Sequence, residues 1–346
     1  MWKNVTANGN QTFNTHTGIV ASGESNPFTN SLTYLTGDYG GYIWLSLNKM
    51  ENWTALTTAG ARRWRSIIIS SNGTFVIVGD EEGYLGKSYN YGTIFQQTTL
   101  PPATGSSNHS NYIGMAASNS FLKIALVAVN NITGLGKIYI SSDSGDSWSA
   151  SNAGTNYWTA IVSSNTGTSL AATTLNSGGL WFSSNSGSTW SNISPSNAYS
   201  NYNMLAGNYL LNVLLTSPMS NVTSSSGTSS RRLQSSGVVY PPNYVSTDYG
   251  VSWATNADLA SIGACAAVAV SSNGSIMMCP IANDFIYTSE NTGATWEVQE
   301  KPDPTFLAQE NWQSATIVNE CSIIAQAKNG PIWIGKFKLI TATSAI

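Results

Sequence analysis

The stretch "SSDSGDSW", residues 141–148, places a Ser, an Asp and a Gly in fixed order before a Trp. An Asp or Asn in such a position accepts hydrogen bonds from backbone N–H groups two or three residues further on, and a Gly adopts a positive φ at little cost. The stretch therefore predicts a tight turn between two strands, with the Trp beginning the second strand.

The same pattern recurs along the chain. Three further copies are complete, "SSNSGSTW" (183–190), "STDYGVSW" (246–253) and "SENTGATW" (289–296), and two are degenerate, "SLNKMENW" (46–53) and "SYNYGTIF" (88–95). The aromatic residues, with Phe95 in the Trp position of its copy, are 42, 53, 42, 63 and 43 residues apart, which indicates a propeller or solenoid. The residues expected to fix these turns are Asn48, Trp53, Asn90, Gly92, Asp143, Gly145, Trp148, Asn185, Gly187, Trp190, Asp248, Gly250, Trp253, Asn291, Gly293 and Trp296.

Each repeat contains four short strand signals. In residues 64–97, the apolar run "SIII" meets the turn "SSNG", "TFVIV" meets "GDEEG", and "YLGKS" leads through the motif into "IFQQ". Such runs without a helix signal predict a four-stranded antiparallel blade.

The two ends of the chain complement each other. The last unit, 312–343, lacks the motif, whereas residues 1–6, "MWKNVT", supply a Trp that opens a polar strand. We expect this strand to join the C-terminal blade as its outermost member, because closing the ring removes the exposed edges. The predicted fold is therefore all-β: one seven-bladed β-propeller domain over 1–346, with a low-complexity insertion at about 217–242 in the fifth blade.

The composition restricts the possible partners. Charged residues make up 9% of the chain against a usual value of about 25%, and the net charge is −3. A basic stripe for nucleic acid is missing from the sequence, as is any run of about 18 apolar residues that could insert into a membrane. The remaining possibilities are protein partners, self-association and a glycan ligand.

Asn-x-Ser/Thr sequons are frequent. The N-terminus has no apolar signal-peptide core, so the chain is either cytosolic or a mature form, and the sequons favour the second. We therefore expect a secreted or cell-surface glycoprotein with N-linked glycans and no other cofactor. The sequons are at Asn4, Asn10, Asn52, Asn72, Asn108, Asn131, Asn192, Asn221 and Asn273.

The three cysteines do not form an even-numbered disulfide framework. Cys265 and Cys279 flank a turn "SSNG" and are candidates for a bridge across paired strands, but we favour buried free thiols for these two and Cys321. The two histidines, His16 and His109, have no partners at metal-ligand spacing, so no metal site is expected.

The Ser-x-Asp-x-Gly-x-x-Trp turns resemble the Asp-box (BNR) repeat, and the resemblance spans essentially the whole chain. Sialidases, sortilin-type receptors, xyloglucan-degrading glycosidases and photosystem II assembly factors share this repeat, so the resemblance implies a propeller but no single function. Sialidases need three arginines from separate blades. The sequence excludes that activity because its five arginines lie in two groups, 62–65 and 231–232.

Acidic residues on turns are the candidates for other glycosidase chemistry, which requires an acid and a base about 5–10 Å apart. Asp38 and the group Asp80, Glu81 and Glu82 fall on neighbouring blades, and Asp284 lies further on. The simpler interpretation is that these carboxylates are solvated turn residues.

Two functional hypotheses follow. The first is a non-catalytic extracellular scaffold, such as a subunit of a cell-surface or filamentous assembly, which packs through the face opposite the motifs and free of glycans. The alternative is a carbohydrate-binding propeller or weak glycoside hydrolase. In that case the aromatics that begin the innermost strands would form a ligand rim, although packing between blades explains them as well. These residues are Trp64, Tyr112, Trp158, Tyr202 and Trp312.

Overall fold

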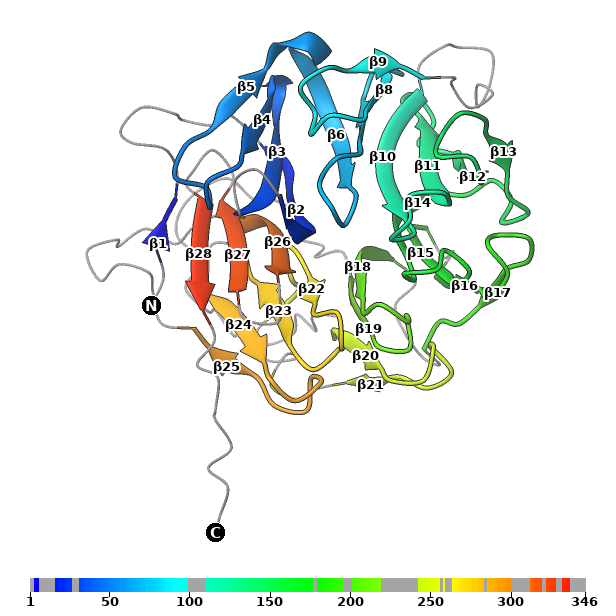
Figure 1. The fold of residues 1–346 in the computed structure, drawn as a ribbon. Helices are drawn as coiled ribbons and strands as arrows, with labels where there is room; N and C mark the ends of the chain where they lie inside the picture. The colour runs from blue at the N-terminus through cyan, green and yellow to red at the C-terminus, as the bar shows by residue number, and fades with distance from the viewer. Residues whose placement is uncertain are drawn as a thin grey trace.

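The structure is a computed structural model in which antiparallel sheets follow one another around a central axis (Figure 1). It describes residues 3–5, 16–26, 31–98, 110–176, 179–195, 201–218, 242–255, 258, 263–282, 285–299, 312–318, 322–327 and 332–336. Sequence predictions that fall on other residues lie outside these ranges.

The first two repeats form a joint sheet because β3 pairs with β6. The first repeat contains β2 (His16–Asn26), β3 (Ser31–Gly41), β4 (Ile43–Ser46) and β5 (Thr54–Leu56). A short 3-10 turn, η1 (Thr57–Ala59), which the sequence does not predict, leads to the second repeat. That repeat contains β6 (Arg62–Ile69), β7 (Val76–Asp80), β8 (Leu85–Ser88) and β9 (Gln96–Gln97).

The next four repeats form separate four-stranded sheets in chain order. The first two comprise β10 (Ser110–Ala117), β11 (Ile124–Asn130), β12 (Gly136–Ser141) and β13 (Ser149–Ala150), then β14 (Trp158–Ser163), β15 (Leu170–Thr174), β16 (Leu180–Ser183) and β17 (Ser191–Asn192). The following two comprise β18 (Tyr202–Gly207), β19 (Leu214–Pro218), β20 (Tyr244–Ser246) and β21 (Ala254–Thr255), then β22 (Ala269–Val270), β23 (Met277–Pro280), β24 (Ile286–Ser289) and β25 (Glu297–Val298).

The last sheet joins the two ends of the chain, as the sequence predicts. It contains β26 (Trp312–Val318), β27 (Ser322–Ala327) and β28 (Ile332–Lys336), with β1 (Lys3–Asn4) at its edge. In the antiparallel β1–β28 pair, Lys3 lies opposite Ile334 and Asn4 opposite Trp333.

The hydrophobic core lies between neighbouring sheets. Every residue of β11, "IALVAVN", is buried, because this inner strand is covered by a sheet on either side. Trp158 of β14 packs against Val127 and Ile138 of the preceding sheet. Likewise Ile324 and Ile332 of the last sheet pack in one cluster with Ile19 and Tyr34 of the first repeat. Each sheet is therefore held mainly by its neighbours.

The alternation of strand direction gives the molecule two faces. The turns between first and second strands and between third and fourth strands meet at one end of the sheets. We call this end the motif face, because the Ser-x-Asp-x-Gly-x-x-Trp turns lie there. The turns between second and third strands form the opposite face.

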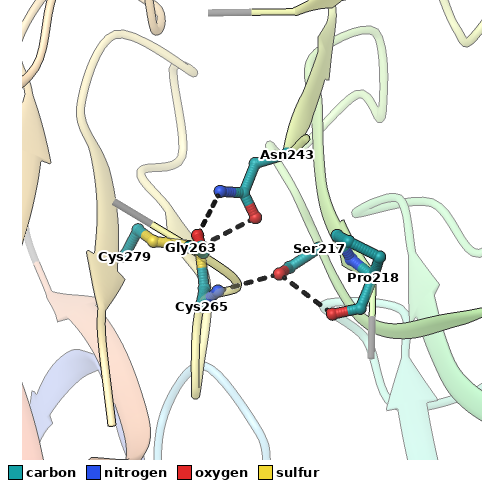
Figure 2. The surroundings of a disulfide bond; sticks show 6 residues. All are labelled: Ser217, Pro218, Asn243, Gly263, Cys265 and Cys279. Carbon is teal, nitrogen blue, oxygen red and sulfur yellow. Dashed lines mark hydrogen bonds between the residues drawn. A yellow bond between two sulfur atoms is a disulfide. The ribbon is translucent and has the colours of Figure 1, made fainter. Parts of the chain in front are cut away.

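A disulfide lies near the opposite face and corrects the expectation of free thiols. Cys265 and Cys279 are bonded, and their Cα atoms are 5.2 Å apart (Figure 2). The backbone N–H of Cys265 donates to Oγ of Ser217 at 2.9 Å, at the end of β19. The predicted insertion at 217–242 is shorter than expected, because Ser217 and Pro218 still belong to β19. Cys321 lies outside the described residues.

Candidate functional site

The motif turns share one hydrogen-bond pattern. In the turn at 141–148, Oγ of Ser141 donates to Oδ1 of Asp143 at 2.7 Å and accepts from the N–H of Gly145 at 2.8 Å. Oδ1 of Asp143 also accepts from the N–H of Ser147 at 2.9 Å. The carboxylate thus binds a donor four residues further on, not two or three, and the Ser has a role that the sequence pattern did not indicate.

Two consecutive residues in each turn adopt a positive φ. Ser144 and Gly145 have φ of 61° and 83°. In the degenerate first copy Met50 takes the Gly position at φ 64°, and its N–H still donates to Oγ of Ser46 at 3.0 Å. The side-chain hydrogen bonds therefore hold the turn even where the Gly is absent.

The Trp of the motif reaches the neighbouring sheet, as expected. Nε1 of Trp253 donates to the carbonyl of Ile193 at 2.6 Å, and Nε1 of Trp53 donates to the carbonyl of Val5 at 3.2 Å. These hydrogen bonds link each turn to the preceding part of the propeller and so stabilise the fold.

The proposed ligand rim is wrong, because all five aromatics are buried. Their exposed fractions are between 0% and 5%, so no ring presents a face on which a sugar could stack. Nε1 of Trp64 donates to the carbonyl of Gly41 in the adjacent repeat at 3.0 Å. The alternative interpretation, packing between sheets, explains them. The residues are Trp64, Tyr112, Trp158, Tyr202 and Trp312.

A charged cluster on the opposite face is the candidate functional site. It forms where β3, the start of β6 and the end of β7 meet, next to the pairing of Tyr39 with Arg63. Three of the five arginines of the chain lie here, in the sequence "RRWR", whose Trp is buried. The side chains of Arg63 and Arg65 are exposed, whereas that of Arg62 is half-buried. The cluster comprises Tyr39, Arg62, Arg63, Arg65, Asp80, Glu81 and Tyr84.

Asp80 is the buried anion of the cluster. Its carboxylate is fully buried, lies 3.2 Å from Nη1 of Arg62, and accepts from the backbone N–H groups of Glu82 and Tyr84 at 2.9 and 2.7 Å. The Arg62 guanidinium in turn lies 4.0 Å from the centre of the Tyr84 ring. Burial raises the pKa of Tyr84; the Arg62 charge opposes this rise, and the nearby Asp80 charge adds a smaller contribution to it. Asp80 therefore stabilises the turn and has no free oxygen for a substrate.

Glu81 connects three repeats. Its carboxylate accepts from the Tyr39 hydroxyl at 2.5 Å and lies 3.0 Å from Nη2 of Arg65. Nδ2 of Asn131, from the β11–β12 turn, donates to its backbone carbonyl at 2.6 Å. The hydrogen bond to Glu81 raises the pKa of Tyr39, because the phenol must keep its proton to donate it. Arg63 makes the longest ion pair of the cluster, 4.0 Å from Glu81, and its side chain is 54% exposed. It is therefore the cation of the cluster most available to a partner.

This geometry does not favour the glycosidase hypothesis. The structure brings Asp38 and the 80–82 group onto the same part of the opposite face, as expected, but Asp38 lies within β3 and not in a turn. Asp80 and Glu81 are both engaged in ion pairs. Asp284 lies outside the described residues.

The sequons occupy both faces. Asn52, Asn72, Asn131, Asn192 and Asn273 are exposed. Asn131 lies on the opposite face beside Glu81, so this face also carries a sequon, which the expected distribution of glycans did not include. Asn4 lies in the edge strand β1, and Asn192 in the edge strand β17. Asn10, Asn108 and Asn221 lie outside the described residues.

A metal site and a membrane-spanning helix are both missing from the described residues. Within them, no three His, Cys, Asp or Glu side chains gather closely enough to hold a metal ion. The same part of the chain contains no helix of the length and apolar character needed to cross a membrane.

Comparisons with solved structures agree on the fold. YCF48 from Cyanidioschyzon merolae superposes with a TM-score of 0.67 at 11% identity, over 97% of this chain and 98% of that one. YCF48 bound to D1 peptide gives 0.64 at 12% identity, over 97% of both chains. The Cps50 (Swd1) β-propeller domain of Myceliophteria thermophila gives 0.64 at 12% identity, over 98% and 100%. This chain is a β-propeller.

The remaining comparisons do not distinguish between an enzymatic and a binding function. An oligogalacturonate lyase from Vibrio parahaemolyticus also superposes, with a TM-score of 0.62 at 9% identity over 98% and 94% of the two chains. The propellers that resemble this chain thus include an enzyme. No protein-family model matches the sequence, and no curated protein matches it.

Only part of the cluster could be recognised in the sequence. The arginines and the carboxylates stood out separately, but nothing connected them with Tyr39, Tyr84 or Asn131. Tyr39 and Asn131 lie 42 and 50 residues from Glu81 in the chain. Only the position of equivalent turns in neighbouring repeats could have indicated that they meet.

Proposed function

We propose that the chain is a non-catalytic interaction scaffold: a secreted or cell-surface, N-glycosylated propeller of seven blades, closed by the pairing of β1 with β28. The hydrogen-bond pattern of its motif turns supports membership of the Asp-box propellers. Its partner is a protein, with a second copy of the chain as the first candidate, because a chain with only 9% charged residues offers little like-charge repulsion.

The observation that carries this proposal is the charged cluster. Arg and Tyr are enriched among the residues that dominate protein interfaces, and here they lie together in a chain poor in charge. Arg63 and Arg65 are 54% and 42% exposed. The apolar side chains of Tyr42 and Ile132, 37% and 81% exposed, lie on turns of the same face. The carboxylates are ion-paired, so the cluster suits binding better than acid–base catalysis.

The test is association in solution. The glycoprotein is purified from a secreting eukaryotic host, and its mass is followed by light scattering and electron microscopy over a range of concentrations. Reversing the charges with R63E and R65E should weaken assembly at least about tenfold, since charged hot-spot losses cost about 2 kcal/mol or more. K49E, on the motif face, is the control and should have no effect. A monomer at every concentration, without cross-links to residues of the cluster, would contradict the proposal.

The alternative is a carbohydrate-binding propeller or weak glycosidase. It is weakened by the burial of the aromatic rim. Binding on a glycan array that R63E and R65E abolish, with the fold retained, would favour it over the scaffold.

A further inference from the structure

A groove on the motif face lies between the β6–β9 and β10–β13 sheets. Its volume is about 390 Å³, and it is lined by Asn72, Thr74, Phe75, Tyr89 and Phe121, among others. Phe75 and Phe121 form the floor, with exposed fractions of 7% and 4% and ring centres 5.0 Å apart, edge to face. The groove thus combines an aromatic floor with amide and hydroxyl groups.

Tyr89 is the exposed ring of this groove. Its side chain is 60% exposed, although its ring centre lies 4.6 Å from that of Phe75. Nζ of Lys87 lies 5.2 Å from the Tyr89 ring and is itself held by Asp146 and by the carbonyl of Ser144. A ring supported in this way and open to solvent is a platform on which a sugar can stack.

A sequon forms part of the groove wall. Oδ1 of Asn72 accepts from Oγ of Ser70 at 2.8 Å, and from the N–H and Oγ1 of Thr74 at 3.1 and 2.8 Å. These bonds fix the amide through its oxygen, while an N-glycan is attached to the other atom, Nδ2. The N–H of Tyr91 donates to the carbonyl of Thr74 at 3.0 Å, which holds the motif turn with Tyr89 beside the sequon.

We propose that the first sugar of an N-glycan on Asn72 lies in this groove and stacks on Tyr89. We assign the Asn72 glycan as the occupant because two residues of its sequon, Asn72 and Thr74, line the groove. This inference rests on the proposed N-glycosylation. It makes the glycan a structural element of the junction between two sheets.

The sixth repeat provides a matched control within the same chain. Oδ1 of Asn273 accepts from Ser271 and Ser275 as Oδ1 of Asn72 does from Ser70 and Thr74, at 2.7 to 2.9 Å. The neighbouring motif turn is held in the same way, by the N–H of Thr292 and the carbonyl of Ser275. At the position of Tyr89, however, this turn carries Glu290. A glycan on Asn273 would therefore lack the ring that Tyr89 offers to a glycan on Asn72.

The experiment measures how fast a peptide-N-glycosidase releases each glycan from the native protein, with occupancy and release followed by mass spectrometry of the glycopeptides. Release at Asn72 should be several-fold to about tenfold slower than at Asn273, the range expected for one stacked ring. Y89A should remove the difference without changing release at Asn273, which also shows that the variant is folded. E290Y should slow release at Asn273.

Equal release at both sites, or no effect of Y89A, would overturn the inference. If mass spectrometry finds other sequons occupied but Asn72 bare, the inference fails while the glycoprotein proposal stands, whereas a chain without any glycan contradicts both. A titration of the N72Q variant with free chitobiose, followed by NMR, tests whether the groove binds a sugar that is not attached to Asn72. If chitobiose binds at Tyr89 in N72Q while Asn72 carries no glycan in the wild type, the groove binds sugars of other molecules. That result would overturn the Asn72 glycan as its occupant.

Discussion

The two faces of this propeller are built on different principles. On the motif face, one set of hydrogen bonds recurs from repeat to repeat: the Ser hydroxyl binds the N–H of the residue four positions further on, as in the Gly145, Gly187, Gly250 and Gly293 turns. On the opposite face, the stabilising contacts differ from repeat to repeat: one place has the charged cluster and another has a disulfide. The comparison shows that repetition maintains the architecture on one face and leaves the other face for features specific to single repeats.

The largest expected effect concerns the disulfide of the opposite face. Replacing both Cys265 and Cys279 by Ala should lower the free energy of unfolding by about 3 kcal/mol, the loop-closure contribution expected for a loop of about 15 residues. Chemical denaturation measures the loss. C321A serves as the control and should leave the bond intact in non-reduced peptide maps. A peptide map of the wild type that links Cys321 to Cys265 or Cys279 would contradict the Cys265–Cys279 disulfide.

The second prediction compares glycines on the two faces. A Cβ at Gly250 would lie 2.3 Å from Cδ1 of Ile193, whereas one at Gly40 would meet nothing within 4 Å, and both residues have a positive φ, 82° and 85°. The conformational cost of Ala is therefore common to both. G250A should destabilise the protein by about 1–3 kcal/mol more than G40A, because it overpacks the junction between two sheets. Equal shifts of the denaturation midpoint would show that the motif turn tolerates movement.

The smallest effect is a pH dependence of the motif turns. Hydrogen bonds from the side chain and backbone of Ser147 lower the pKa of Asp143 to about 2, and those from Ser252 lower the pKa of Asp248. Because the folded pKa is depressed, the stabilisation is present above the ordinary value and is lost as the pH falls from about 4 to 2. Each turn is solvent-exposed, so the loss is below about 1 kcal/mol.

The natural control for this titration is the pair of equivalent turns that carry Asn185 and Asn291. Their amides make the same bonds to the N–H groups of Thr189 and Thr295, at 2.8 and 2.9 Å, without titrating. The double variant D143N and D248N should therefore retain more of its stability at pH 2.5 than the wild type does. Identical unfolding curves for the two proteins across this range would contradict the assignment.

The same contrast explains what the sequence could predict. The motif turns and the β1–β28 pairing were predictable, because local chemistry and the spacing of the aromatics define them. Trp64 and Trp158 were ambiguous, since an aromatic that begins an inner strand can face the axis or the next sheet. The charged cluster could not be predicted from the sequence. Tyr39, Glu81 and Asn131 belong to three repeats, and they meet only because of the way these repeats are rotated relative to one another.

The pairing of β1 with β28 has a consequence for the order of folding. Lys3 precedes its partner Ile334 by 331 residues, so the ribosome makes these two strands at widely separated times. Trp53 likewise donates to the carbonyl of Val5, which belongs to this late sheet. The strand β1 must therefore wait until β28 has been synthesised before the two can pair, and contacts of such long sequence separation form slowly. The early sheets can assemble on one another during this time, so the joining of the two chain ends is expected to be the final step of folding.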